Sequence, residues 1–185
     1  MADAFVRAAR LIDAGGFAAV QRRSWLAAGT ELRLPPPPGA DVMERSWERA
    51  VMAPPSERHH TWVAVETSAG AEVVVGAAAL APASDPDLDP TGCLELLVFT
   101  VDPAQRGHGH GSRLLTAALQ TATAAGEREA VAWLASGDDL LRRFLESAGW
   151  AADGAHRTLA ADDDDSHAGS LRQVRLGTLL EPHTS

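Results

Sequence analysis

The segment "VDPAQRGHGHGSRLL" (residues 101–115) combines glycine, histidine, arginine and serine in a spacing suited to binding an anion. Its glycines stand at three alternating positions, Gly107, Gly109 and Gly111. Glycine has no Cβ, so the backbone of such a loop can approach a bulky phosphate closely. Arg106 adds a positive charge beside the loop, and Ser112 can donate a hydroxyl hydrogen bond. The segment therefore predicts a cradle for a phosphate or pyrophosphate group.

Two other interpretations of this segment stay open, a flexible connector and a metal site. His108 and His110 are only two ligands, whereas zinc takes three or four from the protein. Two familiar phosphate loops do not fit. A P-loop requires lysine, which the chain lacks, and a G-x-G-x-x-G pattern started from Gly107 has Ser112 at its last position. The preferred order is therefore cradle, connector, metal site, and no bound metal is expected.

The elements around this segment are expected to hold it between a strand and a helix. The preceding run "CLELLVFTV" (93–101) is rich in β-branched, aromatic and other apolar residues, which is typical of a strand. Apolar residues then recur at helical spacing from Leu114 to Ala122. A helix that begins directly after the loop presents unpaired N–H groups and its positive dipole end to an anion.

Strands and helices are mixed along the rest of the chain. Further strands are predicted at residues 4–10, 61–66, 72–80, 130–134, 155–160 and 170–176, with a charged hairpin tip at Asp162–Asp165. Further helices are predicted at 13–29, 41–53 and 138–149, with caps at Asp13 and Asp41 and stops at Gly29 and Pro54. This mixture predicts one α/β or α+β domain over residues 1–185, with helices packed on a sheet.

The segment 101–115 resembles the pyrophosphate-binding motif of the GCN5-related N-acetyltransferase (GNAT) superfamily, Arg/Gln-x-x-Gly-x-Gly/Ala. Arg106, Gly109 and Gly111 occupy the pattern positions, and the order of elements also resembles that fold. The resemblance implies a mixed, mostly antiparallel twisted sheet of about six to seven strands with about four helices. It also implies that the central strands 93–101 and 130–134 splay apart.

The same resemblance implies acetyl-coenzyme A, or another acyl-coenzyme A, as cosubstrate. The residues implied for its pyrophosphate are Arg106, Gly107, His108, Gly109, His110, Gly111 and Ser112. The pantetheine arm would follow the main chain of Phe99, Thr100 and Val101 like an extra strand. In a second family motif, "DDLLRRFLESAGW" here, Asp138 replaces the usual asparagine as a cofactor-binding position, and Leu145 replaces the tyrosine that acts as general acid.

Glu95 is the candidate general base. An alkylamine has a pKa of about 10.4 and must lose a proton before it attacks, whereas a thiol of pKa about 8.5 leaves fairly well as thiolate. Glu95 is the one charged residue in "LELLVFTV", where desolvation would raise the pKa of its carboxyl group. Its place also resembles that of the general-base glutamate in the histone-acetylating branch of the family. The alternative is that Glu95 stands at a frayed strand start and faces solvent.

The bulk composition limits the partners. A formal net charge of −9 disfavours nucleic acid, because neutralising phosphates needs a basic surface. We find no apolar run of membrane-spanning length and no charged-then-apolar leader, and the single cysteine, Cys93, suits a reducing compartment. A cytoplasmic protein that does not bind a membrane is therefore expected.

The function that follows is an N-acetyltransferase in which a small-molecule or peptide amine attacks the thioester of acetyl-CoA directly. The alternative is a catalytically impaired acyl-CoA-binding sensor or accessory module, which Leu145 keeps open. Early helices usually cover the acceptor pocket in this family, so Trp25 and Trp47 either wall that pocket or pack in the core. Homodimers are common in the family, so the resemblance allows a homodimer as well.

Overall fold

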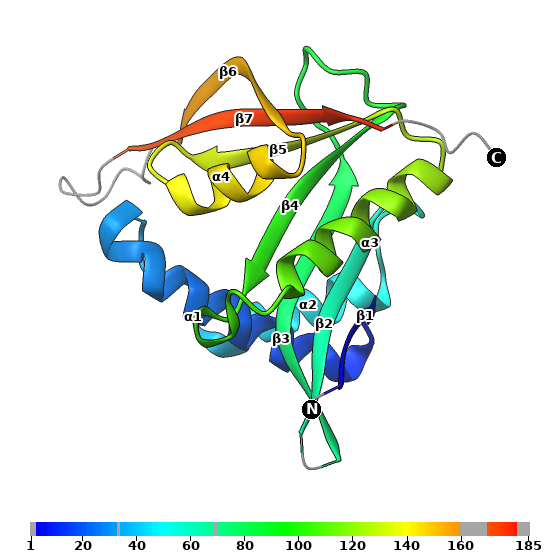
Figure 1. Ribbon diagram of the computed structural model, residues 1–185, viewed down its shortest axis with the longest axis vertical. Helices are drawn as coiled ribbons and strands as arrows, with labels where there is room; N and C mark the ends of the chain where they lie inside the picture. The colour runs from blue at the N-terminus through cyan, green and yellow to red at the C-terminus, as the bar shows by residue number, and fades with distance from the viewer. Residues whose placement is uncertain (1–2, 33, 69, 160–169, 181–185) are drawn as a thin grey trace.

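The computed structural model describes residues 3–32, 34–68, 70–159 and 170–180. They form one seven-stranded sheet in the order β1-β2-β3-β4-β5-β7-β6 (Figure 1). The strands are β1 (Asp3–Ala8), β2 (His60–Ser68), β3 (Ala71–Pro82), β4 (Cys93–Val101), β5 (Glu129–Ala135), β6 (Ala151–Leu159) and β7 (Leu171–Leu179). All neighbouring strands are antiparallel except β4 and β5, which are parallel. The predicted mixed, mostly antiparallel sheet is confirmed.

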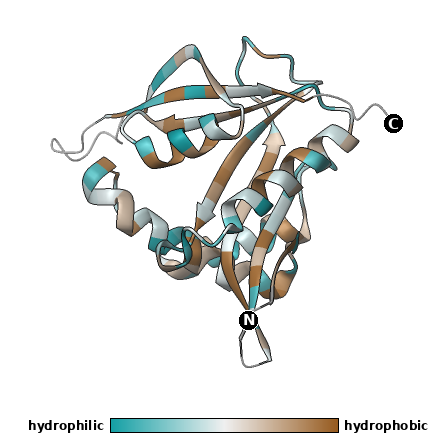
Figure 2. Ribbon diagram, viewed as in Figure 1, coloured by the Kyte–Doolittle hydropathy of each residue, from teal (hydrophilic) through white to brown (hydrophobic). Residues whose placement is uncertain are grey.

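Four helices cover the two faces of the sheet. They are α1 (Ala14–Leu32), α2 (Ala40–Met52), α3 (His110–Ala124) and α4 (Asp139–Ser147). Phe17 of α1 and Trp47 of α2 pack with Val63 of β2 on one face. Leu114 of α3 and Leu145 of α4 belong to the larger core on the other face. Apolar residues accordingly gather along the strands and on the helix sides turned to the sheet (Figure 2).

Strand β4 changes its side-chain alternation at a bulge. Leu80 pairs with Leu96 and Ala79 with Val98, so Leu97 is an extra residue without a partner on β3. Before the bulge, Leu96 faces the α3 side and Glu95 therefore faces the α1 side. The bulge thus separates Glu95 from the part of β4 that leads into the glycine loop.

The two central strands separate soon after they pair. β4 and β5 are in register at three positions only, Cys93–Glu129, Leu94–Ala130 and Glu95–Val131. Strand β5 pairs with β7 over its whole length, from Glu129 to Ala135, and so follows β7 rather than β4. The two strands then diverge as a V (Figure 1). The predicted splay is confirmed.

Three predicted helix signals are wrong. Asp13 ends a 3₁₀ turn before α1, and its carboxylate accepts hydrogen bonds from the Arg7 guanidinium (2.6 and 3.0 Å) and from the Arg10 N–H (2.6 Å). Helix α1 continues through Gly29 to Leu32. The N-cap of α2 is Gly39, and Asp41 inside the helix pairs instead with Arg45 at 2.8 Å. For Asp13 and Asp41, an ion pair with an arginine replaces the predicted helix cap.

Other predicted elements hold with small shifts in their ends. Strand β4 has the predicted bounds, and α2 ends at Met52, two residues before Pro54. The predicted hairpin tip at Asp162–Asp165 lies outside the described residues. None of the helices in the described ranges is long and apolar enough to cross a membrane.

Candidate functional site

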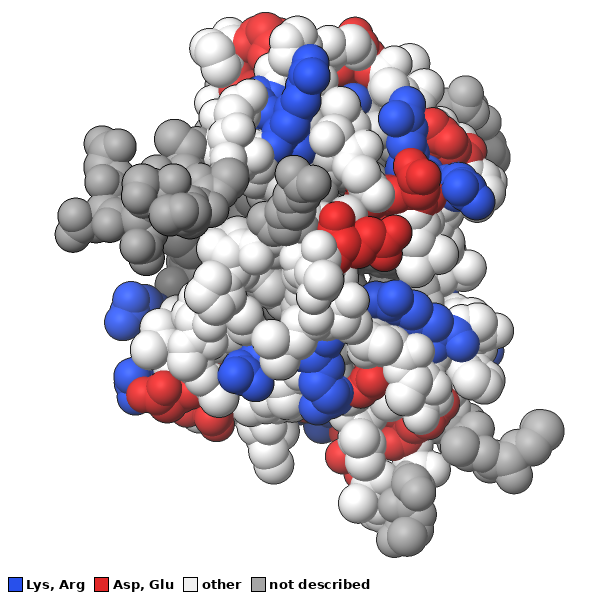
Figure 3. All heavy atoms as spheres, turned by 90° about the vertical axis from the view of Figure 1, so that its left-hand side faces the viewer, with Lys and Arg blue, Asp and Glu red and all other residues white. Residues whose placement is uncertain are grey.

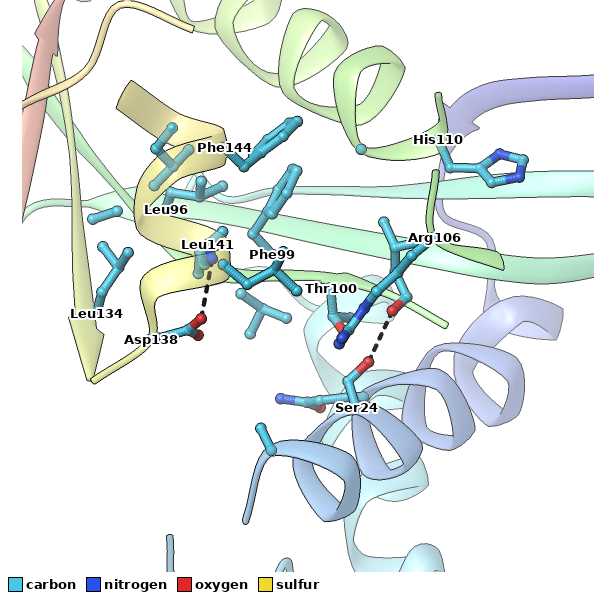
Figure 4. Close-up of a pocket in the computed structure, with 18 of the residues that line it drawn as sticks. Ser24, Leu96, Phe99, Thr100, Arg106, His110, Leu134, Asp138, Leu141 and Phe144 are labelled. Atoms are coloured by element: carbon cyan, nitrogen blue, oxygen red, sulfur yellow. Dashed lines mark hydrogen bonds between the residues drawn. The ribbon is translucent and has the colours of Figure 1, made fainter. Parts of the chain in front are cut away.

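A cleft of about 610 Å³ opens where β4 and β5 diverge (Figure 4). It is lined by β4, the glycine loop, the start of α3, the end of β5, α4 and the later turns of α1. Ten predicted site residues line it: Phe99, Thr100, Val101, Arg106, Gly107, Gly109, His110, Gly111, Ser112 and Asp138. His108 and Glu95 are not among its lining residues. One cleft therefore collects most of the residues whose types suggested binding.

The glycine loop has the backbone geometry of an anion cradle. Gly107 and Gly109 have φ of +82° and +81°, a region that residues with a Cβ avoid, and Gly109 is the N-cap of α3. A Cβ on Gly111 would lie 3.4 Å from the Phe144 ring, so glycine permits the close approach of α3 and α4. The first N–H groups of α3 therefore open into the cleft without side chains in the way.

Charged groups at the mouth of the cleft have different roles. The exposed Arg106 extends toward Ser24 (Figure 4). Arg23 is already committed, because its guanidinium binds the Asp102 carboxylate at 2.6 Å, and Asp102 also accepts from the Ala104 N–H. Arg106 is accordingly the loop's charge that can meet an anionic ligand.

The edge of β4 that faces the cleft has lost its neighbouring strand, since the pairing with β5 stops at Glu95. The Val101 carbonyl accepts a hydrogen bond from the Ser24 hydroxyl at 3.0 Å and is therefore already used. The buried Thr100 Oγ1 has no hydrogen-bond partner among the described residues. An open strand edge with an unpartnered hydroxyl fits an extended ligand that carries amide groups.

The two loop histidines do not form a binding pair. The His110 ring is 2 % exposed, and its Nε2 lies 3.0 Å from the Glu66 carboxylate on β2. It points away from the other labelled cleft side chains (Figure 4). His108 is exposed, with its Nδ1 3.2 Å from the Gln105 carbonyl. Across the described residues there is no group of three or more histidine, cysteine or acidic side chains placed to hold a metal ion.

Glu95 is buried at the point where the strands part. It is 6 % exposed, which makes the solvent-facing alternative wrong. Burial raises the pKa of its carboxyl group above the ordinary value, and the smaller effects of Arg157 and Asp85 oppose each other. Its side chain lies beside the cleft rather than in its lining, one residue before Leu96, which does line it. The raised pKa that a general base requires is thus present at Glu95. Contact of the Glu95 carboxylate with a substrate stays a prediction.

The second motif has mainly structural roles in this chain. The Asp138 carboxylate caps α4 by accepting from the Leu141 N–H at 3.0 Å (Figure 4). Leu145, at the tyrosine position of the motif, lines the cleft and is fully buried. A leucine has no proton to donate, so this position supplies apolar surface. Contact of Asp138 with a cofactor stays a prediction.

The two early tryptophans have different places. Trp25 lines the cleft, whereas Trp47 stacks on Phe17 in the core, with 3.8 Å between ring centroids.

Several cleft residues were not found from sequence. Ser24 and Trp133 line the cleft and were not singled out as binding residues. The helical spacing of Gln21, Ser24, Trp25 and Ala28 marks one face of α1, but that pattern does not say what the face contacts.

Comparison with known proteins agrees with the geometry. The sequence profile described as the acetyltransferase (GNAT) family matches residues 26–150. No curated protein matches the sequence. Among solved structures, an N-acetyltransferase from Staphylococcus aureus Mu50 superposes with a TM-score of 0.72 at 18 % identity, covering 97 % of this chain and 99 % of that one.

Two further solved structures contain the cofactor. A putative acetyltransferase from Salmonella typhimurium with its cofactor acetyl-CoA has a TM-score of 0.70 at 19 % identity, covering 98 % of this chain and 96 % of that one. A phosphinothricin acetyltransferase from Sinorhizobium meliloti in complex with acetyl-CoA has a TM-score of 0.70 at 20 % identity, covering 98 % and 90 %. These likenesses establish the fold, and the profile match spans more than half of the sequence. The chain belongs to the acetyltransferase (GNAT) family.

Proposed function

We propose that this protein is an N-acetyltransferase that moves an acetyl group from acetyl-CoA to a primary amine. The observation that carries the proposal is the coincidence of two features in one cleft. The glycine loop at the start of α3 suits a pyrophosphate, and the unpaired edge of β4 suits a pantetheine arm. The acetyl-CoA in two solved structures of the same fold supports the choice of cosubstrate.

Each part of the cosubstrate has residues that suit it. The backbone N–H groups of residues 107–112 and the Arg106 guanidinium would hold the pyrophosphate. The main chain at Phe99 and the hydroxyl of Thr100 would hold the amide groups of the arm. Phe99 and Phe144, stacked with 5.4 Å between ring centroids, add apolar surface beside it.

Acetyl-CoA supplies an activated acyl group as a thioester. Glu95 takes a proton from the acceptor, directly or through one water molecule, which leaves the amine nitrogen with a free electron pair. That nitrogen forms its bond to the acyl carbon as the carbon–sulfur bond breaks, and the electron pair leaves on the sulfur. The newly bonded nitrogen loses its surplus proton to solvent, which gives the N-acetyl amine. The CoA thiolate takes a proton from solvent because Leu145 has none to give, and Glu95 returns its proton to solvent.

A second function follows from the same leucine. A chain without the usual proton donor could bind acyl-CoA and report its presence without transferring the group. The full burial of Leu145 against the cleft is the observation that favours this sensor. Binding and turnover must therefore be measured separately.

Binding is tested by thermal unfolding with CoA. Free CoA at about 100 times its Kd should stabilise the fold by about 2.7 kcal/mol, which raises Tm by several degrees, whereas Zn²⁺ should leave Tm unchanged. Absence of a shift at saturating CoA would refute both the transferase and the sensor. A shift with Zn²⁺ alone would favour the metal-site interpretation of the loop.

Turnover is tested by following thiol release from acetyl-CoA with a panel of primary amines. Acceptor-dependent release, with the N-acetylated amine identified by mass spectrometry, supports the transferase. CoA binding without release for any amine of the panel supports the sensor.

A further inference from the structure

The wall of the cleft opposite the glycine loop is apolar. It is formed by Trp25, Ala28, Leu32 and Leu34 from α1 and the segment after it, by Leu97 at the β4 bulge, and by Trp133 of β5. Leu97 is 55 % exposed, although it lies in a central strand. In the view of Figure 3, residues without charge (white) lie between blue and red groups near the middle of the surface, with acidic residues adjoining them on the right. An acceptor that enters here meets mostly hydrocarbon.

The acidic residues nearby are paired with arginines. Arg175 of β7 is 5 % exposed, and its guanidinium lies 2.5 Å from Asp87, 2.6 Å from Asp153 and 3.5 Å from Asp85. The Arg175 guanidinium holds the pKa of the Asp87 carboxyl below its ordinary value. Asp89 pairs in the same way with Arg128. Among the described residues beside this wall, the carboxylates of Asp85, Asp87 and Asp153 are therefore engaged by the one guanidinium of Arg175 and that of Asp89 by Arg128.

Trp133 is fixed as a flat surface beside the candidate base. It lies two residues after Val131, the last β5 residue paired with β4, and so shares a face with Glu95. Its Nε1 donates to the Asp85 carboxylate at 2.9 Å, and the Arg157 guanidinium lies 4.3 Å from its ring centroid. Arg157 is itself held by a 2.7 Å hydrogen bond to Gln173. The ring cannot turn without breaking these contacts.

We propose that the acceptor is a monoamine carried on an apolar aliphatic or aromatic skeleton, which packs against Trp133 and Leu97 with its amine directed to Glu95. This inference rests on the proposed transferase function. Polyamines and aminoglycosides are disfavoured for two reasons. Their additional ammonium groups would face the six apolar or aromatic residues named for this wall, none of which carries a carboxylate, and the positive charge of Arg157 would repel them.

The proposal is tested by comparing kcat/KM for four probes. Phenethylamine and isopentylamine should exceed spermidine and kanamycin by at least tenfold. If a polycation is the best acceptor, the inference fails although the transferase function stands. If CoA binds and none of the four amines is acetylated, the inference also fails, and acceptor-dependent thiol release with the wider panel of primary amines then shows whether the transferase function stands.

Two leucine variants test the wall directly. Leu97→Asp should lower kcat/KM for phenethylamine about tenfold and raise it for spermidine, with the Kd of CoA unchanged. Leu26→Asp is the matched control, because Leu26 is 51 % exposed on α1 and does not line the cleft. Equal effects of the two variants would overturn the assignment of the wall.

Variants of Trp133 test the aromatic surface. Trp133→Phe keeps a ring and removes the hydrogen bond to Asp85, whereas Trp133→Ala removes the surface. Trp133→Phe should retain the preference for phenethylamine over spermidine, and Trp133→Ala should lose it, both with the Kd of CoA unchanged. Should Trp133→Ala keep the preference while it stays folded by circular dichroism, the role of Trp133 is refuted.

Discussion

Glu95 and Arg175 are both buried ionisable residues, but only Arg175 has ion-pair partners. Arg175 is surrounded by carboxylates, which raises the pKa of its guanidinium, so its charge is stabilised. The Glu95 carboxylate accepts no hydrogen bond within the part of the chain that the structure describes, and burial raises its pKa. A base needs a pKa close to the working pH, and a desolvated carboxylate is one way to reach it. The proposed role of Glu95 as general base therefore rests on this isolation.

Glu95→Gln should lower the rate of acetyl transfer without lowering the free energy of unfolding at pH 8. Loss of the base should lower kcat/KM about 10²-fold or more, because general-base catalysis typically contributes that much. Folding raises the pKa of Glu95, so the stability that it contributes is present below its unfolded pKa and is lost as pH rises through its folded pKa. The free energy of unfolding at pH 8, measured in urea, should therefore be equal or higher in the variant.

The pH dependence gives an independent check on Glu95. The wild-type rate should fall as the pH decreases through the raised pKa of Glu95, and the variant should lack this dependence. A variant with full rate would show that Glu95 is not the base. A clearly less stable variant would show that the carboxylate is held by favourable polar contacts.

At the scale of elements, the site is a strand, a loop and a helix in direct succession. Strand β4 supplies the open edge, the loop supplies two positive-φ glycines, and α3 supplies free N–H groups. The buried pair of His110 and Glu66 ties the first turn of α3 to β2. His110 therefore positions the start of α3, and His108 faces solvent. We expect the backbone of the loop, rather than these side chains, to make the binding contacts.

Gly109→Ala should weaken CoA binding through the backbone. A residue with a Cβ pays about 1–2 kcal/mol at a positive φ, so the loop would relax away from the geometry that aims its N–H groups. The Kd of CoA, measured by isothermal titration calorimetry, should rise at least tenfold.

Gly126→Ala is the control at the other end of the same helix. Gly126 has φ of +82°, and a Cβ there would meet nothing within 4 Å, so the backbone cost matches that at Gly109. This variant should lose similar stability and keep the wild-type Kd. Equal Kd values for the two variants would contradict the cradle.

At the scale of the whole molecule, the sheet consists of two parts joined at a narrow seam. Strands β1 to β4 form one part and strands β5, β7 and β6 the other, with three residue pairs between β4 and β5. The cleft takes side chains from both parts, including Phe99 of β4 and Leu134 of β5. A ligand in the cleft therefore bridges the two parts and should reduce their relative motion.

Hydrogen exchange should report this bridging. Saturating CoA should slow amide exchange in residues 99–113, where the strand edge and the loop would be covered. Residues 173–177 of β7, which lie between β5 and β6, should exchange at an unchanged rate. Protection confined to β7, with residues 99–113 unaffected, would exclude this cleft as the CoA site.

The features that depend on local order could be predicted from the amino-acid sequence. The run 93–101, the glycine loop and the helix after it could be predicted because alternation, glycine spacing and helical periodicity are short-range patterns. The family motif lies in this same stretch, so the proposed cosubstrate also followed from sequence. Helix ends were less predictable: the Asp13 carboxylate binds Arg7 and Arg10 instead of capping α1, and α1 continues past Gly29 to Leu32.

The way these pieces act together depends on tertiary contacts. The burial of Glu95, the separation of β4 from β5, and the ion pairs between the β3–β4 loop and Arg175 depend on contacts between residues up to about ninety positions apart. No local pattern contains such contacts, because they arise only when strands and loops that are distant in the sequence come together in one fold. The sequence therefore identified a cofactor, whereas the fold was needed to describe the wall that an acceptor would meet.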